Sequence, residues 1–152
     1  NSWELTQTNM DQLTEFLEKS NPQKLMATVE VLNERIRLST SIQNLKEGIK
    51  LAELKQKEIR QMQEALKQTN HTNTFEIENI SSLLENLERE MKQLTAQNSQ
   101  FLDESYQHVV RLEQIALKAN SASTIVHLDF LIERMKQKGD TEKIKKLEEI
   151  KR

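Results

Sequence analysis

Cysteine is absent from this sequence of 152 residues, and glycine and proline are rare. Without cysteine there is neither a disulfide framework nor a thiolate metal site. Gly48, Gly139 and Pro22 are too few for the many turns of a β-sandwich or an α/β sheet. Aromatic residues make up only 4% of the chain, which argues against a thick globular core. The residue types that are missing therefore exclude sheet folds and favour long helices.

Other absences narrow the function. The two glycines are isolated, so no loop can cradle a phosphate, and we expect no nucleotide hydrolysis. A net charge of −2 gives no general attraction to nucleic acid. No apolar run approaches the roughly 20 residues that cross a bilayer. The first residues are too polar for a secretory signal. We therefore expect a cytoplasmic location and no nucleic-acid partner.

Charged residues make up 30% of the chain, a composition typical of long helices packed through narrow apolar seams. Apolar residues recur at steps of three and four, which predicts helices within a single helical domain, residues 1–152. A loop is predicted at 68–79, although Phe75 to Glu78 could be a short extended piece or the lead-in to a helix. The predicted helices cover 10–19, 22–67, 80–117, 124–138 and 141–151.

The predicted helix 22–67 carries two apolar seams whose phase slips near Ser39. Gly48 lies inside this helix at a cost of about 1 kcal/mol relative to alanine, and close packing against another helix is the simplest explanation. The later seam runs through Leu38, Ile42, Leu45, Ile49, Ala52, Ile59 and Leu66. The early seam is Leu25, Val29, Leu32 and Ile36.

The predicted helix 80–117 has a regular seam whose steps alternate between four and three, which indicates a coiled coil. A short loop before it forces antiparallel packing if the two long helices pair within one chain. The expected fold is all-α: an elongated antiparallel coiled-coil hairpin with short helices packed on it. Asn98 and Ser105 are polar seam positions that set the register or mark a docking point for another chain. The seam includes Leu84, Leu87, Met91, Leu94, Asn98, Phe101, Ser105, His108 and Leu112.

The C-terminal helices are too short to be stable alone, so they must dock. Their apolar stripe is expected to cover the widened face of the third helix around Leu102, Tyr106 and Val109. Gly139 ends one helix, and Asp140 caps the next. The stripe consists of Leu128, Leu131, Ile132 and Met135.

The three histidines, His71, His108 and His127, do not have metal-ligand spacing. His108 lies on the seam, where a structural role is expected. His127 is close to Asp129, and such a pair could orient a general base, but no nucleophile is placed to use it. We therefore expect no catalytic residue, metal, cofactor or small-molecule substrate.

Two stretches carry a family resemblance. The first is VEVLNERIRL at 29–38 with IQNL at 42–45, and the second is LEQIALKANSAST at 112–124 with LIE at 131–133. They resemble, in the same order, the helical region that follows the GTPase domain in AIG-type proteins, similar to the GTPases of immunity-associated proteins. The likeness spans most of the chain. The Cys/His-rich insert that family members often carry after the segment at 75–78 is lacking.

The resemblance implies a fragment of a larger, intracellular, GTPase-linked protein of innate immunity, and no matching motif holds a catalytic residue. The expected function is a non-catalytic scaffold for protein–protein interaction or oligomerisation. One alternative is a helical dimer on a membrane surface, for which the basic C-terminal helices would be the contact. Another is an isolated regulatory domain of an immunity-associated GTPase.

Overall fold

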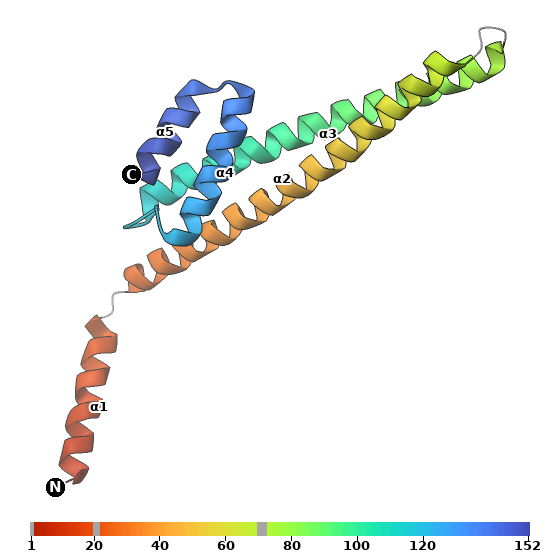
Figure 1. The fold of residues 1–152 in the computed structure, drawn as a ribbon. Coiled ribbons are helices and arrows are strands. Elements are labelled where there is room, and N and C mark those ends of the chain that lie inside the picture. Colours follow the sequence, from red (N-terminus) through yellow and green to blue (C-terminus); the bar gives the residue numbers. More distant parts are fainter. Residues whose placement is uncertain (1, 20–21, 70–72) are drawn as a thin grey trace.

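The computed structural model describes residues 2–19, 22–69 and 73–152, and this part of the chain contains helices and no strand (Figure 1). The two long helices form a hairpin, so the all-α class and the architecture expected from the sequence are confirmed. The helices are α1 (Ser2–Lys19), α2 (Pro22–Gln68), α3 (Thr74–Ile115), α4 (Ala122–Lys138) and α5 (Thr141–Lys151).

Helices α2 and α3 lie side by side and run in opposite directions (Figure 1). Near the start of α2, Glu30 forms an ion pair with Arg111 of α3. Farther along, Lys55 Nζ of α2 lies 2.6 Å from Glu90 Oε2 of α3. Residue numbers therefore rise along α2 as they fall along α3, which is the antiparallel arrangement that a short connection requires.

Helix α3 begins at Thr74, six residues earlier than predicted, because Asn73 caps it. The Asn73 side chain accepts a hydrogen bond from the Glu76 backbone N–H at 3.2 Å and donates one to Glu76 Oε2 at 3.0 Å. The first bond satisfies the Glu76 backbone N–H at the helix start, and the second joins the two side chains. The segment Phe75 to Glu78 is therefore helical, and the predicted loop 68–79 was too long; residues 70–72 lie outside the described part.

Other helix ends also differ from the prediction: α2 ends one residue later, at Gln68, and α4 begins two residues earlier, at Ala122. Helix α1 begins at Ser2 instead of Met10, since residues 2–9 contain neither glycine nor proline and Glu4 favours the first turn. Helix α3 ends at Ile115, two residues early, because the backbone at Ala116 is extended.

The junction of α4 and α5 depends on one glycine and one aspartate. Gly139 has a φ of 78°, in the left-handed region that glycine adopts without strain. Its N–H and that of Asp140 both donate to the Met135 carbonyl, which closes the end of α4. The Asp140 side chain then accepts a hydrogen bond from the Lys143 N–H at 3.3 Å and starts α5.

The core lies where α4 and α5 cover one end of the hairpin (Figure 1). Helices α2 and α3 supply half of its side chains, and the C-terminal helices supply the rest. All four predicted docking residues belong to it. The buried cluster comprises Leu38, Ile42, Leu45, Leu102, Val109, Leu112, Leu128, Leu131, Ile132, Met135, Leu147 and Ile150.

Toward the loop end, the hairpin consists of two helices alone, and its seam is only partly covered. Leu84, Leu87 and Leu94 of α3 are half-buried there, whereas Leu112 in the four-helix part is fully buried. Ile59 of α2 is buried in this part, at 4% exposure, but two helices leave the edges of the apolar stripe open to solvent. The four-helix end therefore carries most of the hydrophobic stabilisation.

Replacing Leu131 with alanine should lower the free energy of unfolding by about 2–5 kcal/mol, because the fully buried side chain leaves a cavity in the core. Denaturant unfolding would measure it. Val126→Ala is the matched control, since this side chain on the same helix is 62% exposed. Equal midpoints for Leu131→Ala and the wild type would mean that α4 does not stabilise the fold.

Candidate functional site

The predicted seam residues lie along the contact between α2 and α3. Leu45 and Leu112 are fully buried, and the others are partly covered. These side chains hold the hairpin together, so most of them are unavailable to a partner. The partly covered residues are Ile49, Leu84, Leu87, Met91, Leu94, Asn98, Phe101 and His108.

The early seam of α2 does not face α3. All four of its side chains are exposed, from Val29 at 48% to Leu25 at 68%. The α3-facing positions in this region are instead Val31, Glu34 and Leu38, roughly half a turn away around the helix. The phase slip near Ser39 therefore marks a change of face. We call the exposed set the α2 stripe: Leu25, Val29, Leu32 and Ile36.

Glu34 is a carboxylate buried on the hairpin seam, with a side chain only 3% exposed. Its Oε2 lies 2.9 Å from His108 Nδ1 of α3, and its Oε1 lies 2.9 Å from Arg37 Nη1. Burial alone would raise the pKa of Glu34, but the hydrogen bonds and charges of Arg37 and His108 outweigh it and lower this pKa below its ordinary value. The cluster therefore joins the two helices at a fixed register, and His108 has the structural role expected of it.

Ser105, the second polar seam position, is fully paired. Its Oγ lies 2.8 Å from Ser41 Oγ of α2, and both hydroxyls lie within hydrogen-bonding distance of the Phe101 carbonyl. Both serines are buried. This contact satisfies the polar groups and fixes the register of the hairpin next to the core.

Asn98 packs against Gly48 across the seam. A Cβ atom at position 48 would lie 2.0 Å from Asn98 Oδ1, so only glycine leaves room for this side chain. The close packing expected at Gly48 is therefore present. Asn98 Oδ1 is itself buried, and among the described residues it has no hydrogen-bond partner.

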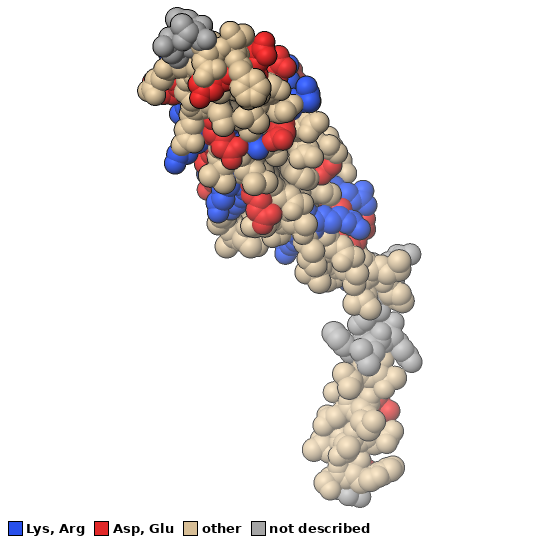
Figure 2. All heavy atoms as spheres, turned by 90° about the vertical axis from the view of Figure 1, so that its right-hand side faces the viewer, with Lys and Arg blue, Asp and Glu red and all other residues tan. Residues whose placement is uncertain are grey.

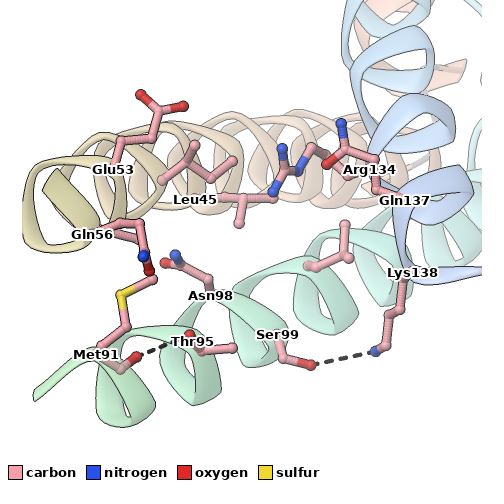
Figure 3. Close-up of a pocket in the computed structure, with 13 residues that line it drawn as sticks. Leu45, Glu53, Gln56, Met91, Thr95, Asn98, Ser99, Arg134, Gln137 and Lys138 are labelled. Carbon is pink, nitrogen blue, oxygen red and sulfur yellow. Dashed lines mark hydrogen bonds between the residues drawn. The ribbon is translucent and has the colours of Figure 1, made fainter. Parts of the chain in front are cut away.

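A groove of about 640 Å³ opens where α4 ends over the hairpin (Figure 3). Figure 3 shows Asn98 of α3 pointing toward α2, while Arg134 and Lys138 reach the groove from α4. Leu45 and Leu102 contribute to an apolar floor. The groove is an open step at the edge of the four-helix part, and it lacks the enclosure typical of a small-molecule site.

Several lysines of the C-terminal helices pair with acidic residues. Asp103 of α3 lies 3.0 Å from Lys143 Nζ and 3.4 Å from Lys138 Nζ. Lys146 Nζ lies 2.9 Å from Glu113 Oε2. Figure 2 shows charges of both signs intermingled over the hairpin, whereas the part of α1 in view is almost free of charge. Carboxylates of α3 therefore partly compensate the positive charge of Lys138, Lys143 and Lys146.

His127 and Asp129 do not form the pair considered from the sequence. Asp129 Oδ1 lies 2.7 Å from Lys151 Nζ of α5, and His127 Nδ1 is buried without a hydrogen-bond partner in the described part of the chain. Burial and the nearby charge of Lys46 lower the pKa of His127. His71 lies outside the described residues. Within residues 2–19, 22–69 and 73–152 no three His, Asp or Glu side chains are grouped to hold a metal ion.

Comparison with protein-family models, with curated proteins and with solved structures gives no match for this chain. The resemblance to the AIG-type helical region therefore remains a prediction. Among the described helices, none has a stretch apolar and long enough to cross a membrane.

Replacing Glu34 with glutamine should destabilise the fold near pH 7 by about 1.5–3 kcal/mol, because hydrogen bonds to a buried charge are lost. The effect should depend on pH. A carboxyl whose pKa is lowered by folding stabilises the fold above the ordinary value of 4.5 and loses that contribution as pH falls through the folded value.

Denaturant unfolding at about pH 7 and about pH 3 should therefore show the wild-type advantage shrinking in acid. Glu53→Gln, an exposed glutamate on the same helix, is the control and should change little at either pH. A difference between wild type and Glu34→Gln that is the same in both buffers would contradict the assigned role of the charge.

Gly48→Ala should destabilise the protein by about 1–3 kcal/mol, because the new methyl group overlaps the Asn98 side chain. In an Asn98→Ala background the same change should instead stabilise by about 1 kcal/mol, since alanine is the better helix former. A double-mutant cycle measured by thermal unfolding gives both values. An identical effect in the two backgrounds would rule out the Gly48–Asn98 contact.

Proposed function

We propose that this chain is a non-catalytic scaffold that associates with itself through the α2 stripe. The observation that supports the proposal is the exposure of four large aliphatic side chains at coiled-coil spacing on one helix face. Single exposed apolar side chains are ordinary on protein surfaces, but a continuous stripe of them marks an interaction surface. The residues are Leu25, Val29, Leu32 and Ile36.

The position of the stripe supports this use. It lies on the side of α2 that faces away from α3, so a partner helix can pack there without disturbing the hairpin. The α3-facing side is held by the Glu34–His108 contact and by the paired serines. A rigid hairpin with one free apolar face can accept an amphipathic helix, which is a common mode of protein recognition.

The buried polar residues of the hairpin support a structural role and not a catalytic one. Glu34 is almost completely buried and already shared between Arg37 and His108. Such a carboxylate holds two helices together instead of facing a substrate. The groove beside Asn98 is open to solvent and does not enclose a ligand, which suits side chains of a protein partner more than a reacting small molecule.

The resemblance to the helical region of AIG-type proteins supports a role for this scaffold as one part of a larger protein. In that setting the chain would follow a GTPase domain in a longer intracellular protein, and association of the hairpins would bring such domains together. The GTPase activity would belong to the neighbouring domain.

The wild-type chain should dimerise in a concentration-dependent manner, and Leu32→Glu combined with Ile36→Glu should make it monomeric, because burying two carboxylates in an apolar contact is costly. Sedimentation equilibrium measures the change. Leu54→Glu is the matched control, since Leu54 is a similarly exposed leucine of α2 outside the stripe. A wild-type protein that stays monomeric over the accessible concentration range would overturn the proposal.

A further inference from the structure

Helix α1 has an apolar face that nothing in the described part of the chain covers. Met10 and Leu13 are 59% and 58% exposed. Among residues 2–19, 22–69 and 73–152, α1 makes no packing contact with another helix, and it stands away from the hairpin in Figure 1. The chain therefore exposes two apolar helix faces at once, one on α1 and one on α2.

The two faces have matching spacing. Val29 and Leu32 of the α2 stripe are three residues apart, as are Met10 and Leu13 of α1. If α1 packs antiparallel to α2, Leu13 meets Val29 and Met10 meets Leu32 in the same register. Helix α1 has 18 residues and is roughly 27 Å long, so it can cover the whole stripe.

The charges are arranged to permit this contact. The acidic residues Glu4 and Asp11 lie more than a quarter turn away from the face that carries Met10 and Leu13. They would remain in solvent when that face is buried. The positions flanking this face include Gln7, which is uncharged. No charge would therefore be removed from water by the contact.

The connection between the two helices favours exchange between chains. Only residues 20 and 21 separate Lys19, the end of α1, from Pro22, the start of α2. Two residues are the lower limit for reversing direction between packed helices. A proline also disfavours a helical backbone at the residue before it. A connection this short promotes domain swapping, in which the same contact forms with a second copy.

We infer that α1 of one copy packs antiparallel on the α2 stripe of a second copy, and that each copy gives its α1 to the other. This inference rests on the proposed function and specifies its partner. Each half of the dimer then buries one α1 face and one α2 stripe, with Leu13 against Val29 and Met10 against Leu32 of the other chain. The exchange leaves the α2–α3 hairpin unchanged.

Because the chain has no cysteine, introduced cysteines report this contact without background. Met10→Cys on a chain that carries a mass tag is mixed with untagged Leu32→Cys, and the mixture is oxidised gently. A disulfide-linked product of one tagged and one untagged chain is expected. Met10→Cys mixed with Leu54→Cys, an exposed site outside the stripe, is the control and should give little of it.

Packing of α1 on the α2 stripe of its own chain would give a different product. A single chain that carries both Met10→Cys and Leu32→Cys should form linked dimers when the helix is exchanged. A disulfide closed within one chain, seen as a faster-migrating monomer after oxidation, would overturn the exchange. Both residues are exposed in the structure, so neither cysteine should impair folding.

The dissociation constant gives a second measurement. Met10→Glu combined with Leu13→Glu should raise the dimer dissociation constant about tenfold or more, as loss of apolar burial at two side chains implies. Thr8→Glu combined with Gln12→Glu adds the same charge on the outer face and should have little effect. A dimer that survives the first pair but is broken by Leu32→Glu would overturn the exchange of α1 and leave the proposed function standing. A wild-type monomer would overturn both.

Discussion

Helix α2 turns one side to α3 along its length. This contact decides which side chains of α2 are buried in the core and which stay exposed to a partner. Leu38, Ile42 and Leu45 lie on that side and are buried. Helices α4 and α5 then add to the same core from the flank of the hairpin. The opposite side of α2 is left without a covering element in the described structure, so its aliphatic residues near the N-terminus form a surface instead of a core.

Hydrophobic periodicity predicted the seam of α3 and the docking of α4, because the side chains that make these contacts are apolar. It failed at the start of α2. There the face that meets α3 includes Glu34, while the exposed face holds Leu32 and Ile36. A pattern that follows apolar residues selects the wrong face when a buried ion pair replaces a leucine. The pairing of Glu34 with His108 joins residues 74 positions apart, and no local pattern reveals it.

Local capping chemistry sets several of the helix ends. Gly139 and Asp140 mark the α4–α5 junction through backbone rules that involve neighbouring residues alone. Asn73 and Glu76 have the same kind of signal, with a side-chain acceptor three residues before a glutamate, and they set the start of α3. Asp129 is different, since its partner Lys151 comes from another helix and is known only once the fold is known.

The α2–α3 seam and the α2 stripe differ in how strictly they select the helix that packs on them and its register. The seam contains Asn98 packed on Gly48 and Ser105 paired with Ser41, and each contact is lost if one helix slides by a turn. Polar positions of this kind set register at some expense of stability. The α2 stripe has only aliphatic side chains, so shape and spacing alone determine which helix fits it. The hairpin is therefore built to form in one way within a chain, whereas the stripe can accept an equivalent helix from its own or from another chain, which is the condition that an exchanged α1 requires.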